Sequence, residues 1–413
     1  MALDACCLKA VGMYMEIIMA LLALLSVALI LGAMADRLGI PKVVGNIISG
    51  ILLGPTVLNL LNYNIGLSGI SEVSLFFIML LVGIEATTGL LTKHIRSSII
   101  LSASSFIVPV SIMILLSVFV FHLNLTQAIV TATAIGVPSI SIISVLVMRY
   151  GLLDTEDGAR IVSSVVLTDV IAFVILASIG ISSVPIYIVV ISIVVFLLAL
   201  LSIDKIIRLH ASSIRKTLAN EYKTKDGEEL IFAGIILLGL IGSAVLQVAG
   251  ITYVLGAFFA GLLIHEAIVG KRVYGVLKRT FSRITNSFFI PLFFSIAGLE
   301  VVIPSHYLWL MLALIIVSGS VGGILSYVAG RKLLRRLKPI TAVGLLGSRG
   351  AVGIIIANIA LLQGDINTDL YSIVILGTVI LSVVLPTLMG GEDGMMHKQH
   401  PRRAKTPQHS PRI

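Results

Sequence analysis

The sequence predicts an all-helical, polytopic membrane protein of about 13 transmembrane helices, and three observations support this. Of the 413 residues, 58% are hydrophobic and only 12% are charged. A soluble domain averages about 25% charged residues, so this chain has too few polar side chains to cover a water-facing surface. The apolar residues fall in blocks of about 18 to 25, the length that crosses a bilayer core of about 30 Å. Finally, the Lys and Arg residues occur in every second loop between these blocks, and the intervening loops lack them.

The apolar blocks define the predicted helices and the domain organisation. We expect an extracellular segment at 1–14, a transmembrane domain at 15–390 and a cytoplasmic tail at 391–413, which is polar enough to be disordered. The expected helices lie at 15–34, 42–60, 72–91, 98–121, 126–148, 160–181, 184–203, 229–248, 253–270, 284–303, 306–330, 339–362 and 369–389.

The basic residues orient these helices. Of the 29 Lys and Arg, 27 lie in every second loop and in the tail, and the intervening loops hold none. Cytoplasmic loops carry the Lys and Arg excess. The N-terminus is therefore expected outside and the C-terminus in the cytoplasm, in the cell membrane. The net charge of +9 is explained by topology, so a nucleic-acid partner is not expected.

The chain also contains an internal repeat. Residues 40–53 align with 251–264, and Gly83–Glu85 align with Gly298–Glu300. Helices 2 and 3 thus correspond to helices 9 and 10. An offset of seven helices is odd, so the second copy enters the membrane from the opposite face, as in many secondary transporters. We expect repeat one at 15–182, a linker helix at 184–203 and repeat two at 229–390. The identical pairs are Ile40/Ile251, Val43/Val254, Gly45/Gly256, Gly50/Gly261 and Leu52/Leu263.

Two helices at equivalent positions of the repeat are interrupted. Helix 5 contains Gly136, Val137 and Pro138, and helix 12 contains Ser348 and Gly350 around Arg349. Either interruption alone is explained by a simple kink. As a pair they indicate broken helices that line a binding site near the membrane midplane, where half-helix ends and free carbonyls face the ligand.

Three ionisable residues lie inside predicted helices: Asp169 in helix 6, Arg349 in helix 12 and Glu85 in helix 3. Each costs about 3 kcal/mol or more at such depth. A structural ion pair explains any of them, and Arg349 and Glu85 are expected as supporting charges. Asp169 is the candidate ion site, because it is the only acid at the centre of a helix and adjoins Thr168.

A single carboxylate is sufficient for antiport if a proton and a dehydrated cation compete for it. The further ligands would be oxygens of Thr168, Ser139 or Ser164 and carbonyls of the broken helix 5, which suit a hard cation such as Na⁺ bound at Asp169. No His/Cys cluster, phosphate loop or nucleophile motif appears in the loops. We therefore expect a transporter of Na⁺ and protons that has no cofactor, and not an enzyme.

Several segments resemble the cation:proton antiporter superfamily, especially its second branch, the NapA and Kef type. This resemblance implies 13 helices in an NhaA-like fold, crossed broken helices 5 and 12, a core domain that moves against a dimerisation domain, and a homodimer in the lipid membrane. The segments are Ile40–Pro55, Phe77–Glu85, Leu255–Gly261, Pro291–Leu299 and Ser348–Gly350.

The chain also departs from the superfamily pattern. Thr168–Asp169 stands where members usually have Asp-Asp, Asn-Asp or Gln-Asp, and Gly136–Pro138 replaces the Thr-Asp-Pro of some members. The helix 11 segment Ser318–Gly322 lacks the Lys of electrogenic members. We therefore expect electroneutral Na⁺(Li⁺)/H⁺ exchange. A Kef-type K⁺ efflux or K⁺/H⁺ exchange system and a non-transporting scaffold are the open alternatives.

Overall fold

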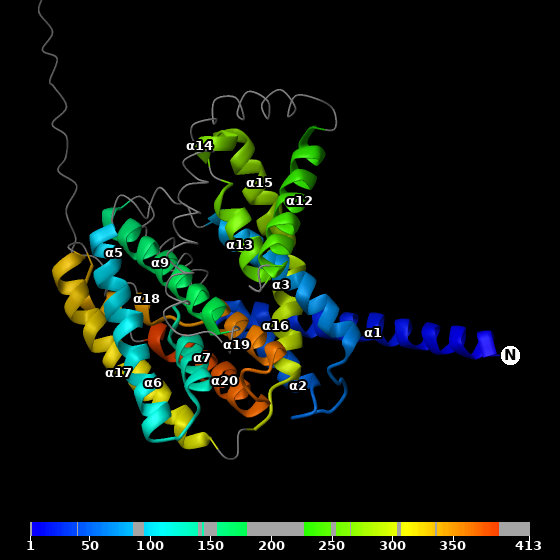
Figure 1. Cartoon of the computed structure of the whole chain (residues 1–413), viewed down its shortest axis with the longest axis horizontal. Coiled ribbons are helices and arrows are strands. Elements are labelled where there is room, and N and C mark those ends of the chain that lie inside the picture. Colours follow the sequence, from blue (N-terminus) through cyan, green and yellow to red (C-terminus); the bar gives the residue numbers. More distant parts are fainter. Residues whose placement is uncertain are drawn as a thin grey trace, which may run out of the picture.

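The computed structural model describes residues 2–38, 40–85, 95–138, 143, 155–179, 227–248, 253–264, 266–303, 307–334 and 337–387 (Figure 1). All regular elements in these ranges are helices. They are α1 (Ala2–Arg37), α2 (Lys42–Leu53), α3 (Ile65–Glu85), α5 (Ile95–Ser102), η1 (Ala103–Ile107), α6 (Val108–Phe119), α7 (Leu125–Gly136), α9 (Glu156–Ile179), α12 (Gly227–Val248), α13 (Tyr253–Leu262), α14 (Glu266–Val269), α15 (Lys271–Ile284), η2 (Thr285–Phe289), α16 (Ile290–Leu299), α17 (Leu308–Leu333), α18 (Pro339–Gly347), α19 (Ala351–Gln363) and α20 (Thr368–Thr387).

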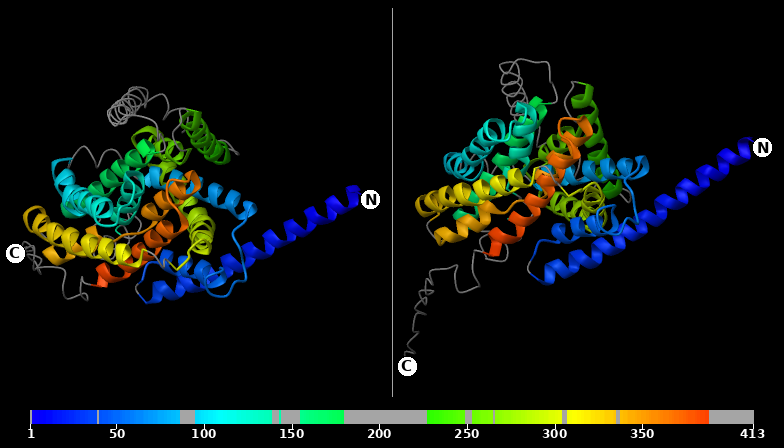
Figure 2. Two further views of the ribbon diagram at one scale, coloured as in Figure 1. Left: turned by 60° about the horizontal axis from the view of Figure 1, so that its bottom comes forward. Right: turned by 90° about the horizontal axis from the view of Figure 1, so that it is seen from below.

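Within the described ranges, six helices are long and apolar enough to cross a membrane, and four shorter apolar helices accompany them. The predicted linker helix 184–203 and the predicted tail 391–413 lie outside the described residues. The first helix differs from its predicted range of 15–34, because α1 is helical from Ala2 and its first part projects away from the other helices (Figure 2). A helix of 36 residues exceeds the length that a bilayer core requires.

The helices form two groups (Figure 1). In the group that we call the glycine bundle, α1 packs on α2 and α2 on α16, while α12 packs on α13 and α13 on α3. In the predicted numbering, α1, α2 and α16 are helices 1, 2 and 10, and α12, α13 and α3 are helices 8, 9 and 3. The second pair of contacts therefore repeats the first, with each helix replaced by its equivalent in the other repeat. This exchange is what an inverted repeat requires.

Glycines allow the closest contacts of the glycine bundle. A Cβ at Gly50 would lie 2.8 Å from the Cα of Gly298 on α16, and one at Gly83 would lie 3.0 Å from the Cα of Gly261 on α13. Gly50 and Gly261 are one aligned pair of the sequence repeat, and Gly83 and Gly298 are the other. The two helix crossings are thus symmetry-related copies in which small residues let backbones touch.

The second group, which we call the broken-helix bundle, contains α5, α6, α7, α9 and α17 to α20. In the described part of the chain, two helices include a π-helical turn: η1 joins α5 to α6, and η2 joins α15 to α16. Each turn ends two residues before a proline, Pro109 or Pro291. A proline lacks the N–H of a regular helix, and the wider turn absorbs this local defect.

Helix 10 begins earlier than the predicted range 284–303, because α15 continues through η2 into α16 without a non-helical residue. The sequence did not predict α15 because five of its residues are basic, so its mean hydropathy is low. Its apolar side chains Val273, Leu277 and Phe281 are buried at a spacing of four residues. This pattern is that of an amphipathic helix with one face on the protein.

Candidate functional site

The two predicted interruptions meet in the structure. Helix α7 ends at Gly136 and α18 ends at Gly347, and each is followed by an extended residue, Val137 or Ser348. Beyond these, Pro138 and Arg349 form an antiparallel backbone bridge. The half-helices α7 and α19 pack against each other there (Figure 1).

The crossing lies on the symmetry axis of the repeat. Gly136 and Gly347 are 211 residues apart, as are Pro138 and Arg349, and this is the separation of Gly45 and Gly256. Each bridged residue is therefore the repeat equivalent of its partner. The structure thus brings together the residues of the two interruptions, Gly136, Val137, Pro138, Ser348 and Gly350. Ser139 lies outside the described residues.

Arg349 is fully buried at this crossing, yet it forms no ion pair with any described acid. Its guanidinium donates hydrogen bonds to the backbone carbonyls of Leu346, at 3.4 Å, and Ser105, at 3.1 Å. The carbonyl of Ser105 is available because the residue four positions later, Pro109, has no N–H to donate. On α17, Gly322 lies beside this contact, and a Cβ there would lie at an ordinary van der Waals distance of 3.5 Å from the guanidinium.

The position of Arg349 also has an electrostatic consequence. Helices α7 and α18 both end at the crossing, and the C-terminal end of a helix carries a partial negative charge. A fixed positive charge beside these ends stabilises them. Within the described residues, Arg349 thus bonds to carbonyls and not to an acid, and the neighbouring segment Ser318–Gly322 of α17 supplies no base.

Asp169 lies in the middle of α9, 1% exposed, and its Oδ1 has no hydrogen-bond partner in the described part of the chain. Helix α9 packs mainly on α5 and also contacts α7, α18 and α19, so the broken helices flank it. One turn after Asp169, the ring of Phe173 lies 5.5 Å from that of Phe258 on α13. This side of α9 therefore faces the glycine bundle.

The two predicted ligands on the same helix are placed differently. Thr168 is buried beside Asp169, and its hydroxyl donates to the carbonyl of Ser164 at 2.8 Å, which leaves its oxygen able to accept a cation. Ser164 precedes Asp169 by five residues, which on a helix points the two side chains to different faces. Its carbonyl accepts a hydrogen bond from Ser102 of α5, at 2.7 Å, so Ser164 belongs to the packing between these helices.

Glu85 lies apart from the crossing. It is the last residue of α3 and is partly buried, in a helix that packs on α13, α15 and α16. The hydroxyl of Tyr274 on α15 donates to the neighbouring carbonyl of Ile84 at 2.8 Å, and Lys278 of α15 interacts electrostatically with Glu85. The structure therefore assigns Glu85 to the attachment of α15.

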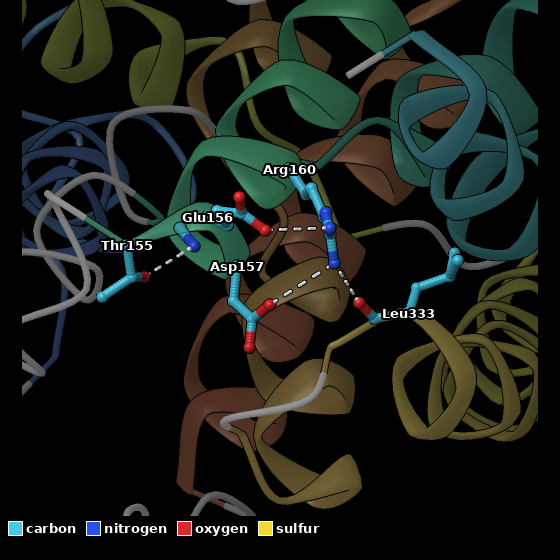
Figure 3. Close-up of polar contacts among 6 residues, drawn as sticks. Thr155, Glu156, Asp157, Arg160 and Leu333 are labelled. Atoms are coloured by element: carbon cyan, nitrogen blue, oxygen red, sulfur yellow. Dashed lines mark hydrogen bonds and ion pairs between the residues drawn. The ribbon is translucent and has the colours of Figure 1, made fainter. Parts of the chain in front are cut away.

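One polar cluster joins the two repeats inside the broken-helix bundle (Figure 3). Arg160 near the start of α9 donates to the carbonyl of Leu333, the last residue of α17, at 2.6 Å. It also pairs with Glu156 at 3.2 Å and Asp157 at 3.7 Å. A cation at a helix C-terminus is favourable, so Arg160 ties the end of α17 to the start of α9.

Comparison with known proteins decides the family. The family described as "Sodium/hydrogen exchanger, transmembrane" matches residues 23–390. The chain belongs to the sodium/hydrogen exchanger family. It is 24% identical over 371 residues to the "Probable Na(+)/H(+) antiporter 3" of Methanocaldococcus jannaschii, which covers 89% of this chain and 94% of that protein. It is 25% identical over 381 residues to the Na(+)/H(+) antiporter of Enterococcus hirae, with 89% and 96% covered.

A solved structure supports the fold of this sodium/hydrogen exchanger. The sodium proton antiporter MjNhaP1 from Methanocaldococcus jannaschii, solved at pH 8, has a TM-score of 0.62 to this chain at 18% identity. The similarity covers 91% of this chain and 95% of that chain. The antiporter fold predicted from the sequence, with inverted repeats and broken helices 5 and 12, is therefore confirmed, as is the resemblance to the cation:proton antiporter superfamily.

Proposed function

We propose that this exchanger moves Na⁺ or Li⁺ against protons by alternating access, with both ions competing for Asp169. The observation that carries the proposal is the buried, unpartnered carboxylate oxygen of Asp169 between the broken helices. An isolated ionised carboxylate is very costly in apolar surroundings. Asp169 is therefore stable with a bound proton or with a bound cation, and one replaces the other.

The neighbouring groups fit a small, dehydrated monovalent cation. The oxygen of Thr168 and the free carbonyls of the break after Gly136 are hard ligands. Asp169 carries one negative charge, so the proton-bound and cation-bound sites have the same net charge. Arg349 keeps its charge in both states because it is bound to carbonyls. The exchange of one cation per proton is then electroneutral.

The orientation and assembly belong to the same proposal. The alternation of basic loops supports a C-terminus in the cytoplasm and an N-terminus outside the cell membrane. The glycine bundle is the natural dimerisation domain of a homodimer, since α1 and α12 expose most of their apolar surface to lipid or to a second copy. The broken-helix bundle, which holds Asp169, is the part that moves.

The test is proton flux in proteoliposomes loaded with a pH-sensitive dye. Wild type should collapse an imposed pH gradient when Na⁺ or Li⁺ is added, and Asp169→Asn should be no faster than protein-free vesicles. Asp365→Asn is the matched control, because Asp365 lies between α19 and α20 and away from the crossing. Equal rates for wild type and Asp169→Asn would refute the proposed site. A response to K⁺ alone would favour the K⁺/H⁺ alternative.

A further inference from the structure

Two hydrogen bonds join the end of α16 to the beginning of α20. The hydroxyl of Tyr371 on α20 donates to the carbonyl of Ala297 on α16 at 2.9 Å. The amide of Val302, just after α16, donates to the hydroxyl oxygen of Ser372 at 2.9 Å. The side chains of Tyr371 and Ser372 are fully buried. The loops at these helix ends, 300–307 and 364–367, contain no Lys or Arg, so both ends face the outside in the proposed orientation.

These bonds cross the boundary between the two bundles. Among the described helices, α16 packs mainly on α1, α2 and α3, while α20 packs on α7, α17, α18 and α19. A second contact across the boundary is apolar, between the rings of Phe173 and Phe258. Apolar contacts are not directional, so these rings tolerate sliding. A hydrogen bond depends on distance and angle, so the two bonds must break when one bundle moves along the other.

Helix α20 also links this end of the protein to the crossing of the broken helices. The side chain of Asn358 on α19 hydrogen-bonds to the hydroxyl of Tyr371. About 16 Å further along α20, the hydroxyl of Ser382 donates to the carbonyl of Arg349 at the break. Both contacts lie inside the broken-helix bundle. Tyr371 is therefore carried along when this bundle moves, and its bond to Ala297 holds the bundle in one position.

We propose that Tyr371 and Ser372 form an outer latch: their bonds to the end of α16 close the ion pathway to the outside, and the structure is the inward-facing state. The inference rests on the proposed function, in which the broken-helix bundle moves and Asp169 faces each side in turn. Neither residue touches the ion. Both are positioning residues, which set the fraction of the protein that is open to the outside.

One group beside the latch favours its opening. Glu300 lies between Ala297 and Val302 in the chain, and its Oε2 is buried without a hydrogen-bond partner in the described part of the protein. A carboxylate that lacks water and partners is costly in its ionised form. Opening of the latch returns water to Glu300, which offsets part of the loss of the two hydrogen bonds. The two states are therefore closer in free energy than the hydrogen bonds alone would make them.

The test compares the Na⁺ dependence of exchange at the two faces of the membrane. Right-side-out and inside-out vesicles are prepared from cells that express the full-length chain and lack other Na⁺/H⁺ exchangers. The apparent affinity at one face is reduced by the fraction of protein that is open to that face. Tyr371→Phe removes one hydrogen bond and keeps the ring, which raises the outward-facing fraction by up to about five-fold. The half-saturating Na⁺ concentration should fall by the same factor at the outer face and should not fall at the cytoplasmic face.

The control is Tyr274→Phe. Tyr274 donates the same kind of bond to the carbonyl of Ile84, at 2.8 Å, but within the glycine bundle. This bond persists when the bundles move, so the half-saturating concentrations at both faces should equal those of wild type. Ser372→Ala removes the second latch bond and should act in the same direction as Tyr371→Phe. The latch is overturned if both latch variants leave the outer value unchanged, or if they move the outer and cytoplasmic values in the same direction.

A cross-link tests the same contact if the latch variants do not fold. In a chain with Cys6 and Cys7 replaced by serine, Val302→Cys and Ser372→Cys are introduced together and treated with a short bifunctional methanethiosulfonate. The joined cysteines should stop exchange because the linked latch cannot open, and reduction should restore it. Exchange by the cross-linked protein at the rate of the reduced protein overturns the latch, and so does the absence of cross-linking.

The outcomes separate the latch from the proposed ion site. If Asp169→Asn exchanges as fast as wild type, the site is wrong, and the opposite behaviour of the two faces in Tyr371→Phe still identifies the latch. If Asp169→Asn is inactive and Tyr371→Phe matches wild type at both faces, the site stands and the latch is overturned. A wild type that exchanges no cation for protons refutes both.

Discussion

Replacing Gly50 by alanine tests the crossing of the two repeats directly. The new Cβ would fall on the carbonyl oxygen of Ser295 and 2.8 Å from the Cα of Gly298, both backbone atoms of α16. No side-chain rotation relieves a clash with backbone, so α2 and α16 must separate. Overpacking of this kind costs about 1–3 kcal/mol, and we expect the upper end, about 3 kcal/mol. Alanine is favoured over glycine in a helix by about 1 kcal/mol, which leaves a net loss of about 2 kcal/mol.

The repeat makes this prediction sharper, because Gly261→Ala should cost as much as Gly50→Ala. Its Cβ would fall on the carbonyl of Leu80 and 3.0 Å from the Cα of Gly83. The control is Gly69→Ala in α3, where no atom lies within 4 Å of the added Cβ. This variant should be stabilised by about 1 kcal/mol.

The assay is thermal unfolding of each purified variant in the same detergent. Unfolding is monitored by intrinsic fluorescence or by the loss of monodisperse protein. Gly50→Ala and Gly261→Ala should melt several degrees below wild type, and Gly69→Ala should melt at or above it. The reasoning is refuted if the two crossing variants melt together with Gly69→Ala, or if only one of them is destabilised.

Four further outcomes follow from the site. Arg349→Lys should lower both the unfolding temperature and the exchange rate, since a lysine cannot span the carbonyls of Ser105 and Leu346; transport by this variant at the wild-type rate would contradict that role. Arg160→Ala should cost about 1–3 kcal/mol in thermal unfolding, because it removes the bond to Leu333 and an ion-pair partner of the buried carboxylate of Asp157, and an unchanged unfolding temperature would contradict this. The apparent Na⁺ affinity in flux assays should fall as pH falls, because protons occupy the same carboxylate; affinity independent of pH argues against competition. Exchange in proteoliposomes at zero pH gradient should not respond to an imposed voltage, and a response would show electrogenic transport.

The features that depend on periodicity and on the repeat were predictable from the sequence. Gly45 and Gly256 reveal the repeat because close helix contacts demand glycine at the same place in each copy. The breaks at Pro138 and Arg349 were predictable because Pro138 and the glycines beside Arg349 weaken the helical hydrogen bonding at equivalent positions of the two repeats. Asp169 stands out because a central acid in an apolar span is costly.

The features that depend on contacts between distant residues were not predictable. An ion pair was one open interpretation of Arg349, but within the described residues its partners are carbonyls, and one of them, that of Ser105, lies 244 residues away in the chain. Pro109 indicates in the sequence that the carbonyl of Ser105 is free to accept a hydrogen bond. The sequence does not indicate which side chain donates to it. Glu85 was expected among the charges that support the site, and its helix instead joins it to α15. That helix escaped notice because its polar face lowers its average hydropathy.

The most direct measurement of the central claim counts the protons that leave the protein when Na⁺ binds. Purified protein in weakly buffered detergent solution is titrated with NaCl at a pH where the site is protonated, and choline chloride serves as the control. Competition at one carboxylate predicts the release of up to one proton per Na⁺ bound in wild type, and none in Asp169→Asn. Sodium binding without proton release, or unchanged release from Asp169→Asn, would contradict the account.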